Sequence, residues 1–143
     1  MRDFEKISFK QFCKDVCFNK NLYDNYKLPI RDSKLTAGYD IFLLEDLEIK
    51  PNEIIKLPTG IKSYFQGDEV LLIVIRSSMG FKYNIRLVNQ VGVIDADYYN
   101  NKNNEGKETI NFKAGEAIAQ GIFLKYLITK SDADLGLERE SDY

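Results

Sequence analysis

Short apolar runs separated by turn-forming residues dominate the chain from residue 37 onward. They include YDIFLL at 39–44, VLLIVI at 70–75 and EAIAQGIFLKYLI at 116–128. Runs of this length, rich in Ile, Val, Tyr and Phe and bounded by Gly, Pro, Asn or Asp, are typical of β-strands. Many such strands without helical patterns between them predict an all-β sandwich or barrel. VLLIVI has no polar alternation, so we expect it to be buried on both faces.

The N-terminal residues follow a different period. Apolar side chains with helical spacing predict a helix over 8–18; they are Phe9, Phe12, Cys13, Val16 and Cys17. Ser8 and Gln11 have the spacing of a capping box, and Ile7 and Phe12 are placed to form its hydrophobic staple. Asn19 is expected to end this helix. The following NLYDNYKLPIRDS is expected to be extended, because Pro29 disfavours helix immediately before it.

The composition restricts the chemistry more than the fold. The 143 residues suggest one domain, and the net charge of −2 gives no general attraction to nucleic acid. There is no histidine, so acid–base catalysis would depend on carboxylates, Lys or Tyr. Cys13 and Cys17 without histidine do not make a zinc site and are expected to be packed, reduced thiols. The start MRDFEKISFKQF has no long apolar run, so we expect a cytoplasmic protein that does not span a membrane.

Two segments carry polar groups that would suit a phosphate site. RSSMG at 76–80 follows the most apolar run and offers the guanidinium of Arg76, the hydroxyls of Ser77 and Ser78, and Gly80, which permits tight backbone geometry with exposed amides. The alternative is a turn with an exposed arginine. In AGYDI at 37–41, Asp40 lies within an apolar strand, where an acid is paired, hydrogen-bonded or near a metal's water shell, unless it faces solvent at a strand edge.

Two later segments are ambiguous when each is considered separately. In AGEAIAQGIF, Ala114 and Gly115 resemble a turn that opens a strand, and Gln120 is a polar side chain within that strand. In NQVGVIDADYY at 89–99, Asp95 and Asp97 share one face of an extended segment. A carboxylate at the end of a buried strand can serve as a general base for water. The alternative is a hairpin with a solvated acidic tip.

The order of these pieces is more specific than any one of them. AGYD, RSSMG, NQVGVIDADY and GEAIAQ, in this sequence and at these separations, resemble four of the five motifs of trimeric dUTP diphosphatase (dUTPase). The resemblance covers residues 27 to about 126, and GFKYNIRLVNQVGVIDADYYNN is especially similar to dUTPases of bacteria and their phages. It implies a jelly roll (β-clip) at 27–130 that assembles as a homotrimer. Residues 1–26 would then be an N-terminal helical extension, and 131–143 a tail.

The resemblance also implies an activity. Family members hydrolyse dUTP to dUMP and pyrophosphate with Mg²⁺, which keeps uracil out of DNA and supplies dUMP for dTMP synthesis. Their sites form between subunits. The implied partners are the nucleotides dUTP and dUMP and two further copies of the chain, with no nucleic acid and no membrane.

Roles for individual residues follow from the matching positions. Asp95 would orient and deprotonate the attacking water, and Tyr98 would lie beneath the deoxyribose and exclude a 2′-hydroxyl. The uracil edge would bind Asn89 and the backbone of Gly92, Val93 and Ile94. The phosphates would bind Arg76, Ser77, Ser78, Gly80 and Gln120. Asp40 would take part, through water, in the network around the metal.

Three features depart from the family pattern. Ile75 stands where the family usually has proline. NNKNNEG runs almost directly into KETINFKAG, where the family has a further strand and turn. We favour residues missing from the sequence over a true deletion, because a jelly roll rarely tolerates the loss of a strand. The family's glycine-rich fifth motif has no counterpart in LGLERESDY, so Arg139 receives no role. Without that tail we expect substrate binding with reduced turnover.

Two other functions remain as alternatives. A dCTP deaminase shares the fold and the Arg-Ser-Ser segment, but it needs a glutamate beside the cytosine ring, and VNQVGVIDADY lacks the expected form. A binding or regulatory protein built on the same scaffold would be non-catalytic, and the missing fifth motif gives that alternative some support.

Overall fold

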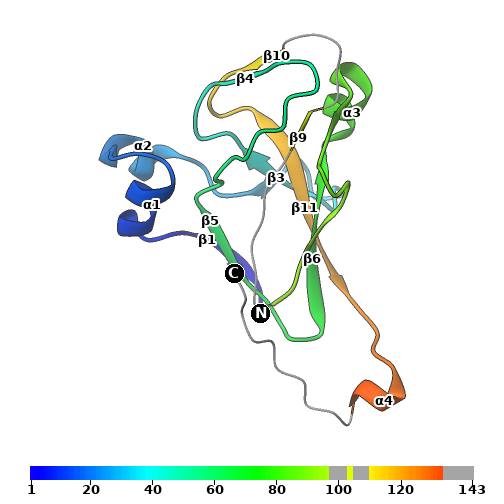
Figure 1. The fold of residues 1–143 in the computed structure, drawn as a ribbon. Helices are drawn as coiled ribbons and strands as arrows, with labels where there is room; N and C mark the ends of the chain where they lie inside the picture. The colour runs from blue at the N-terminus through cyan, green and yellow to red at the C-terminus, as the bar shows by residue number, and fades with distance from the viewer. Residues whose placement is uncertain (97–102, 105–109, 134–143) are drawn as a thin grey trace.

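The computed structural model describes residues 1–96, 103–104 and 110–133, and these are mostly strands. A five-stranded antiparallel sheet with the order β2-β3-β11-β6-β8 forms the centre. Its strands are β2 (Ile30–Arg31), β3 (Tyr39–Phe42), β11 (Ala117–Lys125), β6 (Glu69–Ile75) and β8 (Gly92–Ile94). The long strands β6 and β11 run side by side through the middle of the molecule (Figure 1). The all-β prediction is confirmed.

Three pairs of short strands surround this sheet. They are β1 (Asp3–Lys6) with β5 (Ile61–Tyr64), β4 (Leu47–Ile49) with β10 (Ile110–Phe112), and β7 (Ile85–Arg86) with β9 (Asn103–Asn104). All three pairs are antiparallel. The first pair joins the N-terminal residues to the body of the domain, with Phe4 opposite Ser63. The expected division between an extension at 1–26 and the domain at 27–130 stays a prediction.

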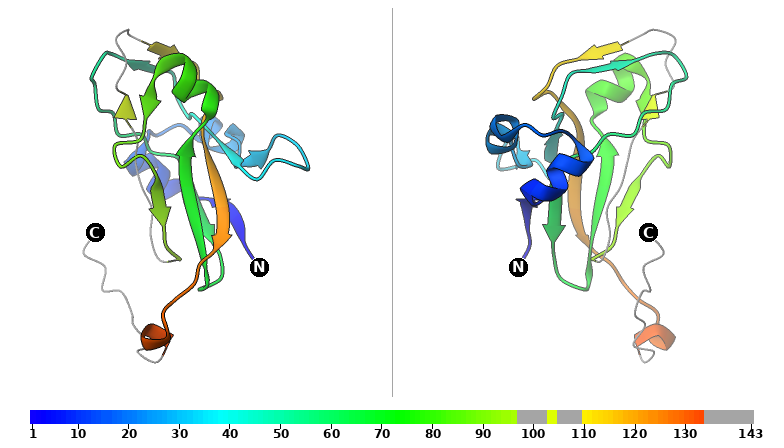
Figure 2. Two further views of the ribbon diagram at one scale, coloured as in Figure 1. Left: turned by 90° about the vertical axis from the view of Figure 1, so that its right-hand side faces the viewer. Right: turned by 60° about the vertical axis from the view of Figure 1, so that its left-hand side comes forward.

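Two helices, not one, follow the first strand. α1 (Phe9–Asp15) is shorter than the expected 8–18, and α2 (Lys20–Asn25) occupies residues expected to be extended. Asn19 begins α2 instead of ending α1, because its side-chain oxygen accepts the Leu22 N–H at 3.0 Å. The extended expectation was therefore wrong for 21–25. Figure 2 shows the two helices lying beside β1 and β5 on one flank of the molecule.

The expected cap of the first helix is present on one side only. Ser8 is the N-cap, and its hydroxyl accepts the Gln11 N–H at 3.1 Å. The Gln11 side chain does not return to Ser8; it donates to Asp15 Oδ1 at 2.8 Å, four residues later. Half of the capping box therefore forms, and the other half is replaced by a side-chain pair along the helix.

Both core clusters lie on one face of the central sheet, the face to which Leu71, Ile73 and Ile75 of β6 point. The larger cluster lies towards the β4–β10 end and contains Ile41, Leu43, Leu47, Ile49, Ile85, Phe112, Ile118 and Ala119. A smaller cluster joins Phe4 of β1 to Leu71 of β6 and Ile94 of β8. These clusters fix the two ends of β6, and both candidate regions of the site begin at those ends.

The strand β6 is less buried than its sequence predicts. Leu71 is only 4% exposed, but the apolar residues 70 and 72–75 are all partly accessible. The expectation of burial on both faces is therefore wrong for the single chain. The reason is that the five-stranded sheet lacks a complete layer over one face, so apolar runs on β6 keep contact with solvent.

Two further helices complete the described structure. α3 (Ser77–Tyr83) follows β6 directly, and the one-turn α4 (Lys130–Ala133) lies apart from the sheet beyond the end of β11 (Figure 1). None of the helices in the described ranges combines the length and apolar character needed to cross a membrane.

Candidate active site

Segments distant in sequence meet at the upper end of β6. Arg76 is the N-cap residue of α3, and its Nε lies 3.4 Å from Asp40 Oδ1 on β3. Its Nη1 donates to the carbonyl of Ala117 on β11 at 3.4 Å. The Asp40 side chain is only 16% exposed, so the alternative of a solvent-facing acid does not hold. The pair places the guanidinium beside the first turn of α3, where the sequence predicts phosphate binding.

A glycine makes room for the amide in this cluster. Gln120 on β11 lies opposite Asp40 on β3, and its side chain passes over Gly38. A Cβ added to Gly38 would overlap Gln120 Oε1 and lie 2.8 Å from its Cδ. Any residue other than glycine would therefore push the amide aside. The motifs AGYD and GEAIAQ are thus joined by a direct steric relation between two residues.

The turn before β11 is fixed by a carboxylate. Gly115 has a φ of +86°, which supports the predicted turn at Ala114 and Gly115. Asp46 Oδ1 accepts the Ala114 N–H at 2.8 Å. This hydrogen bond, together with nearby Lys113, lowers the pKa of Asp46 below its ordinary value. The charged carboxylate helps to set the point at which β11 begins, and therefore where Gln120 lies.

The RSSMG segment is a helix start, not a glycine turn. Ser77 and Ser78 lie exposed in the first turn of α3, but the Gly80 N–H donates to the Arg76 carbonyl at 3.1 Å. The Gly80 N–H is therefore not an exposed amide, because the helix already uses that donor, and the predicted role of Gly80 in phosphate binding stays a prediction. The hydroxyls of Ser77 and Ser78 and the guanidinium of Arg76 stay predicted phosphate donors.

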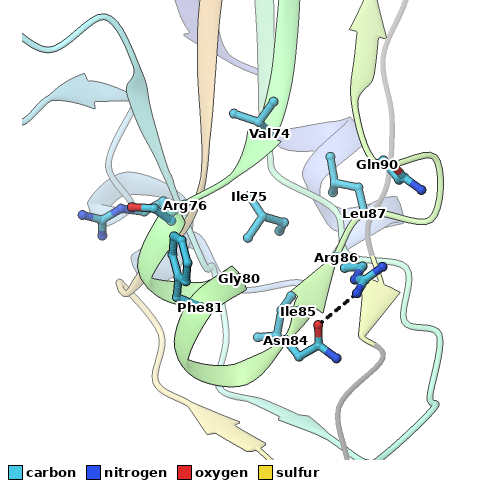
Figure 3. A pocket seen from close by; sticks show the side chains of 11 residues that line it. Val74, Ile75, Arg76, Gly80, Phe81, Asn84, Ile85, Arg86, Leu87 and Gln90 are labelled. Atoms are coloured by element: carbon cyan, nitrogen blue, oxygen red, sulfur yellow. Dashed lines mark hydrogen bonds between the residues drawn. The ribbon is translucent and has the colours of Figure 1, made fainter.

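An open pocket of about 470 Å³ lies between α3 and the segment 84–90. One face of the helix lines it with residues 77, 80, 81 and 84, and the end of β6 supplies Val74 and Ile75 (Figure 3). Three residues predicted from sequence line the pocket: Arg76, Ser77 and Gly80. Ser78 belongs to a different face of the helix and is not among them.

Sequence reasoning missed four further residues of the lining. Phe81, Asn84, Arg86 and Gln90 all face this pocket, and Phe81 is 93% exposed. The helical spacing of Ser77, Phe81 and Asn84 was the available signal, but RSSMG was interpreted as a loop. A helix over 77–83 would have placed them on one side.

The segment predicted to read the base forms a turn and an edge strand. The Gln90 N–H donates to the Leu87 carbonyl at 3.0 Å, and Gln90 has a φ of +63°, so Asn89 lies exposed at the tip of a tight turn. The next residues, Gly92 to Ile94, form β8, which pairs with β6. Val93 is 54% exposed. Since β8 is the outer strand of the described sheet, alternate N–H and C=O groups point away from β6.

Asp95 lies at the opposite end of β6 from Arg76. Ile94 pairs with Leu71, so Asp95 lies beside Val70. Val70 precedes Arg76 by six residues along β6. At about 3.3 Å per residue this separates the two by roughly 20 Å. The left view of Figure 2 shows α3 above β6 and the end of β8 below. Tyr98 lies outside the described residues.

The described side chains do not form a multidentate metal site. In residues 1–96 and 111–133 no group of three or more Cys, Asp or Glu side chains is arranged to hold an ion. Asp40 is paired with Arg76 instead. Mg²⁺ often takes few protein ligands and coordinates substrate phosphates and water. The donors at this end therefore fit a metal that arrives with a phosphate chain, and a role for Asp40 in its water shell stays a prediction.

Comparison with known proteins agrees with this arrangement. The dUTPase family model matches residues 24–141. A deoxyuridine 5'-triphosphate nucleotidohydrolase of Lactococcus lactis is 41% identical over 123 residues, which cover 79% of this chain and 81% of that protein. One from Pseudomonas fluorescens is 40% identical over 107 residues, 69% of this chain and 70% of that protein.

Solved structures give the same result. The crystal structure of a dUTPase from Streptococcus mutans has 39% identity and a TM-score of 0.66, and the match covers 89% of this chain and 98% of that one. A dUTPase variant from phage phi11 of S. aureus matches all of this chain and 98% of its own with a TM-score of 0.69, although at 20% identity it supports the fold alone. The chain therefore belongs to the dUTPase family.

Proposed function

We propose that the protein hydrolyses dUTP to dUMP and pyrophosphate in the cytoplasm, by attack of a carboxylate-activated water. The observation that carries the proposal is the convergence of Gly38, Asp40, Arg76 and Gln120 at one end of β6. These residues come from three of the motifs that resemble the family, and the fold brings them together without any of them being adjacent in sequence.

The phosphate chain is proposed to bind at this end. Arg76 uses Nε towards Asp40 and Nη1 towards Ala117, and its side chain is 36% exposed. Its Nη2 remains available to a phosphate oxygen. The hydroxyls of Ser77 and Ser78 and the amide of Gln120 add neutral donors. Fixed donors of this kind stabilise the charge that develops on the leaving pyrophosphate without reorganisation during the reaction.

Mg²⁺ is proposed to enter with the substrate. When bound to the phosphates it neutralises part of their charge and orients the chain. Asp40 is the residue in this cluster that would contact the metal's water shell. Its pairing with Arg76 fixes the carboxylate near the phosphate donors.

The base is proposed to bind along the outer edge of β8. Uracil presents an acceptor at its 4-position where cytosine presents a donor. Backbone groups of Gly92 to Ile94 have fixed positions because β8 is bonded to β6. A base with the wrong pattern would leave those groups unpaired, which can reduce the rate by several orders of magnitude. Asn89, at the tip of the preceding turn, is proposed to bind the same edge.

Asp95 is the proposed general base. It follows β8 directly and is half-buried, so it lies next to the proposed base site and its position depends on the same pairing with β6. A carboxylate suffices to deprotonate water held beside a metal-bound phosphate, and no histidine is needed. Tyr98 is proposed to exclude ribonucleotides by occupying the space of a 2′-hydroxyl.

The separation of the two ends supports an oligomer. Asp95 and Arg76 of one chain lie at opposite ends of β6, so one complete site needs Asp95 from one copy and Arg76 from another. The single chain also exposes apolar side chains, among them Val93 at 54% and Leu127 at 97%. Exposed apolar surface of this kind is typical of subunit interfaces. We propose a homotrimer, in which three equivalent sites form by rotation.

A substrate panel tests the proposal. The protein is incubated with Mg²⁺ and either dUTP, dCTP, dTTP or UTP, and pyrophosphate and ammonia are measured. We expect pyrophosphate from dUTP alone. Ammonia from dCTP would support a deaminase instead, and nucleotide binding without either product would support a non-catalytic protein. Tyr98→Ala is expected to hydrolyse UTP as well as dUTP. An unchanged preference for dUTP over UTP would contradict the proposed contact between Tyr98 and the sugar.

A further inference from the structure

The turn that leads into β8 contains a strained backbone position. Gln90 has a φ of +63°, in a region that residues with a Cβ rarely adopt. The Val91 N–H donates to the Asn89 carbonyl at 2.7 Å, which closes a γ-turn centred on Gln90. A γ-turn whose central residue has a positive φ is the rarer and more strained of the two kinds. Glycine and asparagine adopt such a φ readily, whereas glutamine does not.

Hydrogen bonds on both sides hold Gln90 in this conformation. Its N–H donates to the Leu87 carbonyl at 3.0 Å, so a β-turn and the γ-turn overlap at Asn89 and Gln90. Together they form most of the connection between β7, which ends at Arg86, and β8, which begins at Gly92. Figure 3 shows Gln90 in this turn, across the pocket from α3. A connection so short, closed by two hydrogen bonds, restricts the point at which β8 can start.

The start of β8 has a second constraint. Gly92 pairs with Ile73 of β6, and a Cβ added to Gly92 would lie 3.1 Å from the Cβ of Ile73. The next two residues alternate, since Val93 is 54% exposed and Ile94 is 5% exposed. A shift of β8 by one residue would exchange these faces and would place a side chain against Ile73. The register of β8 therefore requires Gly92 opposite Ile73, and the turn centred on Gln90 decides which residue arrives there.

We propose that Gln90 is a positioning residue for base recognition, whose positive φ holds β8 in the register that presents the backbone of Gly92 to Ile94 to the base. The inference rests on the proposed function, because it takes the base site to be the outer edge of β8. The same register sets the place of Asp95, which follows Ile94 directly. In this role Gln90 acts through the backbone that follows it and needs no contact between its own side chain and the substrate.

Three substitutions separate the conformation of Gln90 from its side chain. Gln90→Val introduces a β-branched residue, for which a positive φ is unfavourable. Gln90→Gly and Gln90→Asn keep the positive φ accessible but remove or shorten the side chain. We expect Gln90→Val to lower the preference for dUTP over dCTP, measured as the ratio of the two kcat/KM values, by roughly tenfold, because strain of this kind shifts an equilibrium by about that factor. Gln90→Gly and Gln90→Asn should retain the preference.

Asn52→Val is the matched control for strain. Asn52 also has a positive φ, of +60°, but it follows β4 and belongs neither to β8 nor to the lining of the pocket. Its variant should lose thermal stability without changing the preference between dUTP and dCTP. A comparable loss of preference in Asn52→Val would overturn the proposal, because strain far from β8 would then have the same effect. An unchanged preference in Gln90→Val, or an equal loss in Gln90→Gly, would also overturn it.

Inhibition by parts of the substrate distinguishes positioning from general structural support. In Gln90→Val, inhibition by deoxyuridine, which carries the base without phosphate, should weaken by the same factor as the preference falls. Inhibition by inorganic pyrophosphate should stay unchanged. Equal weakening for both inhibitors would indicate a general loss of structure and overturn the proposal.

Two further measurements keep the inference separate from other failures. If the wild-type protein does not hydrolyse dUTP, the proposed function fails, and calorimetric titration of wild type and Gln90→Val with deoxyuridine still tests Gln90. Failure of the wild-type protein to bind deoxyuridine would overturn this inference too. If Gln90→Val does not fold, Gln90→Gly decides: a retained preference for dUTP over dCTP supports the role of the backbone, and a lost one overturns it.

Discussion

The two ends of β6 carry the two halves of the proposed site in different ways. At the Arg76 end, side chains from the segments 38–40, 76–78 and 117–120 are brought together by pairing between β3, β11 and β6. The other half is one continuous segment from Asn89 to Asp95, a turn and an edge strand that run along β6 from near its Arg76 end to the Asp95 end. The first region depends on packing among several elements, whereas the second depends on the backbone of one.

The two halves are therefore expected to respond differently to substitution. At the Arg76 end, a larger residue in one motif can displace a side chain from another motif, as a Cβ at Gly38 would displace the amide of Gln120. The Asp95 half is expected to tolerate side-chain changes on its outer face, because its proposed recognition groups are backbone atoms, but not the loss of its pairing with β6 or of the proposed base, Asp95. Since the two ends are roughly 20 Å apart in one chain, neither half is sufficient alone.

The largest effect is expected for Asp95→Asn. Replacing the proposed base by an isosteric amide removes the proton acceptor but keeps the shape, so kcat should fall by about a hundredfold to ten-thousandfold while nucleotide binding is retained. Steady-state kinetics and calorimetric titration with a non-hydrolysable dUTP analogue would measure the two separately. Full dUTP hydrolysis by the variant would show that another group is the base.

Mixing two inactive variants tests whether the halves come from different copies. Asp95→Asn lacks one half and Arg76→Ala the other. If each site combines two copies, random co-assembly should restore about a quarter of the wild-type sites. Activity would be measured after joint refolding, with each variant refolded alone as the control. If both halves of a site came from one chain, the mixture would stay inactive.

Gly38→Ala is expected to weaken only the Arg76 end. The new methyl group would displace the Gln120 amide, and because the flexible end of that side chain can move, stability should change little. We expect kcat/KM for dUTP to fall roughly tenfold, the usual consequence of losing one positioned donor. Gly67→Ala is the matched control, since an added Cβ there meets nothing within 4 Å. A similar loss in both variants would argue against the Gln120 explanation.

The smallest expected effect is an acid sensitivity at the Asp95 end, where β6 begins with Glu69. Burial raises the pKa of this carboxyl, but hydrogen bonds from the Gln66 N–H at 3.0 Å and from Arg2 at 2.6 Å outweigh it and lower the pKa below the ordinary value of 4.5. A lowered pKa in the folded state stabilises the protein above about pH 4.5, and the contribution is lost as the pH falls through the folded value.

Thermal unfolding measured between pH 3 and 7 would check this expectation. The Tm of the wild-type protein should fall more steeply below about pH 4.5 than the Tm of Glu69→Gln, which cannot titrate there. Hydrogen exchange should place the first loss of protection in β1 and the start of β6, not at the Arg76 end. Parallel Tm profiles for both proteins would contradict a role for Glu69 in acid stability.

The strands could be predicted because their signal is local. Runs such as those at 39–44, 70–75 and 116–128 each became a strand, and Ser8 capped the first helix as its spacing indicated. The second helix was missed because an asparagine such as Asn19 is equally suited to end one helix or to begin the next. Its role was decided by packing, since Tyr23 meets the buried Phe12 ring edge-on and Tyr26 stacks on it.

The candidate site divides in the same way. The identity of Asp40, Arg76 and Gln120 followed from the order of their motifs, but their mutual contacts did not. Gly80 was assigned a free backbone donor that the helix in fact uses. Asn84 and Arg86 were overlooked as lining residues because no short motif contains them, and the pocket exists only where α3 faces the next segment.

The sequence by itself determined the strand-rich fold, the absence of histidine chemistry and the family to which the motifs point, because periodicity, composition and motif order are properties of the chain. Only the tertiary structure decided which residues touch. It placed Gln120 over Gly38, paired Asp40 with Arg76 and put Asp95 at the far end of the same strand. Such contacts depend on sheet register and helix boundaries, which are set by packing between segments distant in sequence.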